Sequence, residues 1–231
     1  MTVPEPTHVK FAVAQAEAVS ALLIAPTGAR ACYVLAHGAG AGMTHAFLAA
    51  LAGLLAERAI ATLRYQFPYM EKGTKRPDPP KLAQATVRAA VDEAARLLPG
   101  CPLIAGGKSF GGRMTSQAQA QDALAGVRGL AFVGFPLHPA GQPATTRAEH
   151  LAHVQVPMLF LQGTRDELAD LELIEALATD LGSRATLRVF EDADHSFHVR
   201  KRSGSNDGQI LSGLADAIAQ WTSALPAPGK R

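Results

Sequence analysis

Gly107-Lys108-Ser109-Phe110-Gly111 is the stretch of sequence that decides the fold of this chain. It follows a short apolar run at 102–105 and precedes a segment, 111–120, that predicts a helix. A strand, a G-x-S-x-G turn and a helix in this order predict a nucleophile elbow, which presents a serine hydroxyl at the edge of a sheet. A side chain at Gly107 or Gly111 would crowd such a bend, and the helix N-terminus below the serine favours developing negative charge.

The same residues allow two other interpretations. Gly107-Lys108-Ser109 is also the end of the phosphate-binding pattern G-x-x-x-x-G-K-[ST]. That pattern needs a glycine at position 102, where Pro102 stands, and the intervening residues favour a strand over a loop that wraps phosphates. The remaining alternative is a glycine-rich turn with an ordinary surface serine. The pentapeptide alone does not separate this turn from an elbow, so the rest of the chain must decide.

Composition indicates a globular domain of the α/β class. The chain has 231 residues, 48% of them hydrophobic and 18% charged, and its net charge of +2 predicts neither a nucleic-acid nor a membrane partner. Cys32 and Cys101 are too few for a disulfide framework, so we expect free thiols. Residues 1–10 lack a basic segment followed by an apolar one, and no apolar run approaches the length of a membrane span. We therefore expect a cytoplasmic protein.

Apolar runs alternate with amphipathic segments along the chain. The expected strands are 19–25, 31–36, 60–65, 102–106, 127–135, 156–162 and 185–190. The expected helices are 44–58 (capped by Thr44), 81–98, 111–120, 170–181 and 209–221, and 66–80 is expected to be a loop. This alternation predicts a mostly parallel sheet with helices on both faces, in a single domain (1–231, core about 18–222).

A serine nucleophile needs a base, and the base needs an orienting acid. Functional groups in a parallel sheet gather at the carboxyl ends of its strands. Asp166 follows the 156–162 strand and His195 follows the 185–190 strand, so Ser109, Asp166 and His195 have the Ser…Asp…His order of α/β-hydrolases. Capping of the next helix is the alternative role of Asp166, and the rival acid is Asp170.

Two further histidines compete with His195 for the role of base. His138 lies in a proline-rich loop after a strand, where it could instead line the pocket, and His198 lies three residues past His195. Asp192 and Asp194 are so near His195 in sequence that we do not expect their carboxylates to reach its ring correctly. Position after a strand and chain order favour His195.

The glycine-rich segment His37-Gly38-Ala39-Gly40-Ala41-Gly42 supplies the second half of an oxyanion hole. We expect the backbone N–H groups of Ala39 and Phe110 to be its two donors. A dinucleotide-binding G-x-G-x-x-G pattern would need its third glycine at 43 or 45, which are Met43 and His45. His37 is expected to fix the loop by hydrogen bonding. No Cys/His pair has zinc spacing, so no metal or other cofactor is predicted.

Several motifs together resemble one known family. They are His37-Gly38-Ala39-Gly40, Arg64-Tyr65-Gln66-Phe67-Pro68-Tyr69, Gly106-Gly107-Lys108-Ser109-Phe110-Gly111-Gly112-Arg113, Gly134-Phe135-Pro136-Leu137-His138-Pro139 and Ala193-Asp194-His195-Ser196-Phe197. Over residues 20–222 the chain is similar to the bacterial branch of the KANL3/Tex30 α/β-hydrolase-like family, which is related to dienelactone hydrolases. The resemblance implies an α/β-hydrolase fold and a Ser109–Asp166–His195 triad, and little about substrate. Dienelactone hydrolases use a cysteine nucleophile, so Ser109 argues against that lactone chemistry.

The sequence therefore predicts a serine hydrolase with a minimal lid that cleaves a small ester or thioester of a small-molecule acyl substrate. Gly38, His37, Lys108 and His138 are the expected pocket residues, and a small open cleft would suit short acyl groups. The alternative is a non-catalytic interaction domain on the same scaffold, because fold does not fix function. A complete triad at three strand ends argues against that alternative.

Overall fold

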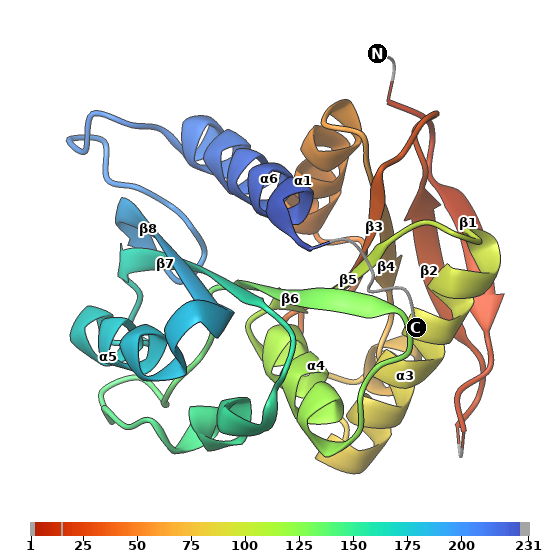
Figure 1. Cartoon of the computed structure of the whole chain (residues 1–231), viewed down its shortest axis with the longest axis horizontal. Helices are drawn as coiled ribbons and strands as arrows, with labels where there is room; N and C mark the ends of the chain where they lie inside the picture. The colour runs from red at the N-terminus through yellow and green to blue at the C-terminus, as the bar shows by residue number, and fades with distance from the viewer. Residues whose placement is uncertain (1–2, 15, 227–231) are drawn as a thin grey trace.

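The computed structural model describes residues 3–14 and 16–226. They form an eight-stranded sheet in the order β1-β2-β4-β3-β5-β6-β7-β8, seen edge-on in Figure 1. The strands are β1 (Thr7–Phe11), β2 (Val19–Ile24), β3 (Ala31–Ala36), β4 (Ile60–Tyr65), β5 (Leu103–Lys108), β6 (Val127–Val133), β7 (Met158–Arg165) and β8 (Ala185–Asp194). The strands from β3 to β8 run parallel, whereas β1 and β2 are antiparallel to their neighbours. This is the α/β-hydrolase architecture that the sequence predicts.

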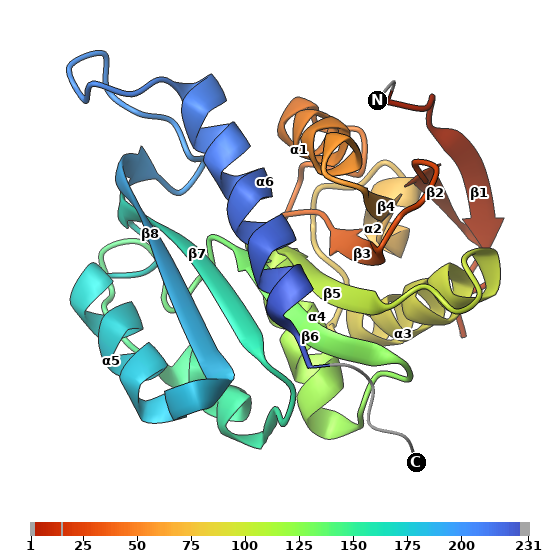
Figure 2. The same cartoon turned by 45° about the horizontal axis from the view of Figure 1, so that its top comes forward.

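Helices cover both faces of the sheet. On one face lie α1 (Ala46–Glu57) and α6 (Asp207–Ala224), and Figure 2 shows α6 crossing the sheet beside α1. On the other face lie α3 (Pro80–Leu97), α4 (Phe110–Gln121) and α5 (Leu171–Leu181) (Figure 1). The short helix α2 (Pro68–Glu71) follows β4, and two 3-10 helices, η1 (Thr146–His153) and η2 (Gly182–Arg184), precede β7 and β8.

The central strand β3 is buried at every position, so its sequence does not alternate between apolar and polar residues. Cys32 and Val34 pack into the core under α3, α4 and α5, whereas Tyr33 and Leu35 pack into the core under α1 and α6. Because successive side chains of a strand point to opposite faces, a strand covered on both faces must be apolar throughout. Its length and position match the apolar run at 31–36.

The predicted strands and helices are all present, with small differences at their ends. Four elements were not predicted: β1, the two 3-10 helices η1 and η2, and α2, which lies in the expected loop 66–80. The expected cap Thr44 is wrong, because His45 is the N-cap of α1 and its Nδ1 accepts from the Phe47 N–H at 3.3 Å. A histidine is not a usual cap, so the pattern favoured the neighbouring threonine.

The connection between β6 and β7 is compact, as the prediction of a minimal lid requires. Its only helix in the described structure is η1, which packs against α4 through a Ser116 Oγ to His150 Nε2 hydrogen bond of 2.7 Å. Cys32 and Cys101 are free thiols. Among the described residues, no helix combines the length and the apolar character needed to cross a membrane.

Candidate active site

Ser109 lies at a sharp turn between β5 and α4. Its backbone angles are φ 50° and ψ −115°, a conformation that residues other than glycine rarely adopt. The glycines on either side of Ser109, Gly107 at the end of β5 and Gly111 at the start of α4, lie very close to β3 and the residue that follows it. An ideal Cβ at Gly107 would lie 2.2 Å from the carbonyl oxygen of Ala36, and one at Gly111 would lie 2.6 Å from that of His37. The two glycines of the G-x-S-x-G pattern therefore have the steric role that the sequence indicates.

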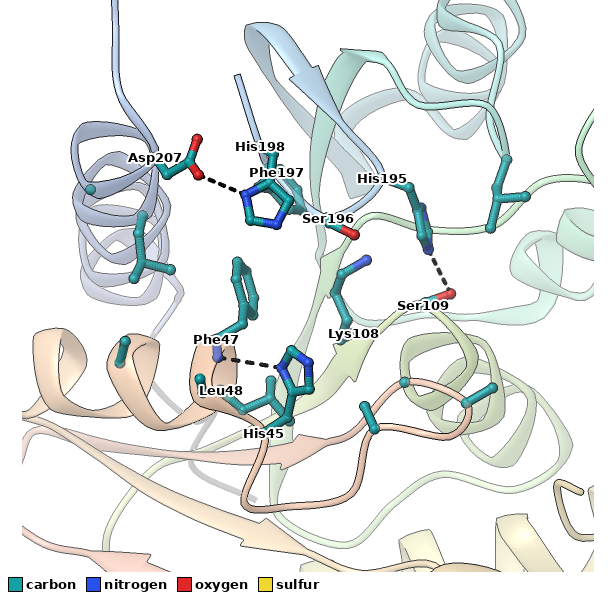
Figure 3. Close-up of a pocket in the computed structure, with 18 residues that line it drawn as sticks. His45, Phe47, Leu48, Lys108, Ser109, His195, Ser196, Phe197, His198 and Asp207 are labelled. Carbon is teal, nitrogen blue, oxygen red and sulfur yellow. Dashed lines mark hydrogen bonds and ion pairs between the residues drawn. The ribbon is translucent and has the colours of Figure 1, made fainter. Parts of the chain in front are cut away.

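Three side chains from three strand ends form one hydrogen-bonded chain. The Nε2 atom of His195 lies 2.9 Å from Ser109 Oγ, and Nδ1 lies 2.7 Å from Asp166 Oδ2. The first of these contacts is drawn in Figure 3. With the proton on Nδ1, the imidazole donates to the carboxylate and its Nε2 can accept the serine proton. This is the geometry of a nucleophile, a general base and an orienting acid.

Asp166 is buried and held by more than the histidine. Its Oδ1 accepts the backbone N–H of Leu168 at 2.8 Å, and its Oδ2 also accepts from Gln162 Nε2. The Gln162 side chain, fully buried on β7, accepts the N–H of Phe135 through Oε1 at 3.1 Å. Gln162 thus fixes the carboxylate and ties β7 to the loop after β6. The sequence analysis missed it, although a polar residue near the end of an apolar strand is the signal that could have found it.

The rival acids and bases have other partners. Asp194 Oδ1 accepts the N–H groups of Ser196 and His198, which shapes the turn that carries His195. His198 is exposed and pairs with Asp207 at 2.7 Å. Asp170 is the N-cap residue of α5, so the helix-capping position belongs to it and not to Asp166.

His138 and His37 fix loops and do not line the cavity. His138 is buried, with Nδ1 2.9 Å from the Pro139 carbonyl and Nε2 accepting the Asp170 N–H at 3.1 Å. His37 is also buried, donates through Nδ1 to the Gly38 carbonyl at 2.8 Å and accepts the Phe67 N–H at 3.1 Å. Burial lowers the pKa of His37 to about 4. The hydrogen-bonding role expected of His37 is confirmed. The prediction of His37 and His138 as pocket residues is wrong, whereas Gly38 and Lys108 do line the cavity.

The loop after β3 passes close to Ser109, since an ideal Cβ at Gly38 would lie 3.8 Å from the Ser109 Cβ. The hydroxyl of Tyr69 accepts the Gly40 N–H at 3.0 Å, and Gln66 Oε1 accepts the Met43 N–H at 2.8 Å, so α2 and its flank hold this loop in place. Within the described part of the chain, neither the Ala39 nor the Phe110 N–H donates a hydrogen bond to the protein. Both are therefore available to a ligand oxygen, as the prediction of an oxyanion hole requires.

A cavity of about 710 Å³ opens beside Ser109 and His195. It extends between α1 and the start of α6, and Figure 3 shows the side chains around it. Most of its walls are apolar, and its residues include Ala39, Phe47, Leu48, Leu168, Phe197 and Leu211. The Phe47 and Phe197 rings stack with centroids 6.0 Å apart. No residue of η1 lines the cavity, so the β6–β7 connection leaves it uncovered.

Lys108, next to the nucleophile, also lines this cavity. Its Nζ is buried, and burial lowers its pKa to about 8, against the opposing effect of Asp166 and Asp194. Across residues 3–14 and 16–226, no group of three or more His, Cys, Asp or Glu side chains is arranged to hold a metal ion.

A sequence model of the alpha/beta hydrolase domain (Abhydrolase_11) matches residues 29–223. This chain belongs to the alpha/beta hydrolase family. Solved structures share the fold of this alpha/beta hydrolase at low sequence identity. XC6422 from Xanthomonas campestris, an α/β serine hydrolase without a lid, is 21% identical with a TM-score of 0.75, and the match covers 98% of each chain. Dienelactone hydrolase from Anabaena variabilis is 20% identical with a TM-score of 0.75, covering 98% of this chain and 100% of its own.

A third solved structure with this fold is Est1E from Butyrivibrio proteoclasticus with ferulic acid bound. It is 16% identical with a TM-score of 0.75, and the match covers 93% of this chain and 99% of that one. At such identities these likenesses establish the fold, and the chemistry must come from the residues of this chain.

Proposed function

We propose that this chain is a serine hydrolase that cleaves a small ester or thioester through an acyl-enzyme. The observation that carries the proposal is the continuous contact Ser109 Oγ–His195–Asp166, with distances of 2.9 Å and 2.7 Å. The description of the fold neighbour XC6422 as a serine hydrolase agrees with it. We also propose that the chain belongs to the KANL3/Tex30-like branch of the family, on the motifs quoted above.

The first half-reaction forms the acyl-enzyme. Ser109 Oγ attacks the ester carbonyl carbon while His195 Nε2 takes the hydroxyl proton. The N–H groups of Ala39 and Phe110 donate to the oxygen that becomes negative, and one such donor contributes roughly 10²–10³ in kcat. His195 then gives its proton to the leaving alcohol or thiol as the bond to the acyl carbon breaks.

The second half-reaction consumes water. His195 removes a proton from a water molecule that attacks the acyl carbon, and Ser109 leaves with that proton as the acid is released. Asp166 stays ionised and stabilises the imidazolium in both halves. Its hydrogen bonds from Leu168 and Gln162 hold the carboxylate in the orientation that the Nδ1–H needs.

A fluorophosphonate probe tests this proposal, because it phosphonylates only an activated serine. We expect the wild type to be labelled and Ser109→Ala to be unlabelled, followed by turnover of p-nitrophenyl acetate and butyrate by the wild type alone. Equal labelling of both proteins would overturn the proposal. A folded wild type that resists the probe and turns over no ester would favour the interaction-domain alternative.

A further inference from the structure

Lys108 lines the wall of the cavity, and its ammonium nitrogen is buried without a hydrogen-bond partner in the described part of the chain. The ammonium lies 5.7 Å from the centre of the Phe197 ring, and Figure 3 shows the side chain directed toward His195 and Ser196. An ammonium group removed from water is costly unless an acceptor or an opposite charge meets it. The described residues therefore offer no hydrogen-bond acceptor that offsets the cost of burying this ammonium.

The carboxylates that face Lys108 are already engaged. Asp166 accepts from His195, Gln162 and the Leu168 N–H. Asp194 accepts two backbone N–H groups through Oδ1. The only carboxylate that lines the cavity in the described structure, Asp207, accepts from His198 and from the Val199 N–H. None of the three forms an ion pair with Lys108 within 4.0 Å, so the ammonium has no direct partner among them.

Gly134 lets the Lys108 ammonium and the His195 ring pack close to the backbone after β6. An ideal Cβ at Gly134 would lie 3.0 Å from Lys108 Nζ and 3.4 Å from His195 Nδ1. Any larger residue at 134 would press on both side chains. The stem of Lys108 forms part of the cavity wall, so rotation about its last torsions presents the ammonium to a ligand without movement of the backbone.

We propose that the ester substrate carries a carboxylate, within a few carbons of the scissile carbonyl, that pairs with Lys108. This inference rests on the proposed hydrolase function and names its substrate class. One ammonium in a mostly apolar cavity matches a monoanion, whereas a phosphate dianion would leave one charge unpaired. A charge-assisted hydrogen bond of this kind contributes roughly tenfold to a hundredfold in affinity.

Binding to Ser109→Ala, measured by calorimetry, tests the inference without need of turnover. The ligands are monoethyl glutarate, with the carboxylate on the acyl side, and 3-butyryloxypropanoate, with the carboxylate on the alcohol side. Their neutral references are ethyl valerate and propyl butyrate. We expect at least one anionic ester to bind about tenfold or more tightly than its reference, and Lys108→Met in the same background to abolish that preference. Lys81→Met, which removes an exposed lysine of α3 on the other face of the sheet, should leave the preference unchanged.

The outcomes separate this inference from the proposed function. Equal affinity for the anionic and neutral esters would overturn it, and so would a preference that Lys108→Met does not reduce. Failure of the wild type to react with a fluorophosphonate, with the anion preference intact, would overturn the hydrolase and leave an anion-binding cavity. Hydrolysis of neutral esters without any anion preference would leave the hydrolase and remove Lys108 from substrate recognition.

Discussion

Gly111 offers the sharpest test of how the elbow is built. It is the second residue of α4, and a Cβ there would lie 2.6 Å from the Cβ of Ala36 and 2.6 Å from the carbonyl oxygen of His37. Ordinary carbon contacts are about 3.5–4.0 Å, so Gly111→Ala forces α4 and β3 apart by about 1 Å. Neither neighbour is a flexible side chain that could move aside.

The cost follows from two opposing effects. Overpacking a rigid site destabilises by about 1–3 kcal/mol, and backbone neighbours put this site near the upper value. Alanine gains about 1 kcal/mol over glycine in a helix, so the net loss at Gly111 is about 2 kcal/mol. Gly53, in the middle of α1, is the matched control because a Cβ there meets no atom within 4 Å. The same substitution at Gly53 should stabilise by about 1 kcal/mol.

Urea unfolding measures both values, and the denaturant slope shows whether the unfolding transition is unchanged. A shift of Ser109 by about 1 Å should also lower kcat/KM for p-nitrophenyl butyrate on the order of 10²-fold in Gly111→Ala. Gly53→Ala should keep wild-type activity. A Gly111→Ala protein as stable as the wild type would refute the steric explanation of the elbow. Equal losses in both variants would place the cause outside these contacts.

Three further predictions follow from the site and the buried histidines. His195→Gln should lower kcat on the order of 10⁶-fold and Asp166→Asn about 10⁴-fold, measured with the same ester, and the double variant should be no worse than His195→Gln. Ser109→Gly should be about 1 kcal/mol more stable than Ser109→Ala in urea, because glycine relieves the strained φ of 50°. Burial lowers the pKa of His37 and His150 to about 4 from 6.5, so only the unfolded chain binds their protons between these values. The free energy of unfolding should therefore fall as the pH drops from about 6.5 to about 4, by up to about 1.4 kcal/mol per pH unit for each histidine, and His150→Gln should flatten the curve.

The central strands could be predicted from the sequence because they are buried on both faces and therefore form continuous apolar runs. Runs such as 31–36 and 60–65 match β3 and β4 in both bounds. The edge strand β1 gave no such signal, because its residues are mostly exposed or half-buried and it pairs on one side only. Helix α2 was missed because four residues that begin with a proline have no amphipathic period to detect.

The positions of Ser109, Asp166 and His195 could be predicted because each one follows a strand, and parallel strands end at one edge of the sheet. The loop histidines could be assigned only in part, because a hydrogen-bonding role was expected for His37 but its partners, and the role of His138, were not. His37 and His138 also follow strands, yet the Nδ1 of each contacts the carbonyl of the next residue, and the Nε2 of each accepts a backbone N–H from a distant segment. Such pairings depend on how loops fold back in space, and the sequence does not encode them in any local pattern.

Unlike the loop histidines, Lys108 has a position that follows from strand periodicity. Side chains alternate along β5, and Ile104 belongs to the core under α1 and α6, so Lys108, four residues later, must face the same side. That side holds the cavity, which is lined by residues from the first turns of α1 and α6. Strand periodicity therefore directs a lysine one residue before the nucleophile to the cavity side of the sheet, where its ammonium is buried. The same five residues thus place the nucleophile and the charge that we infer selects its substrate.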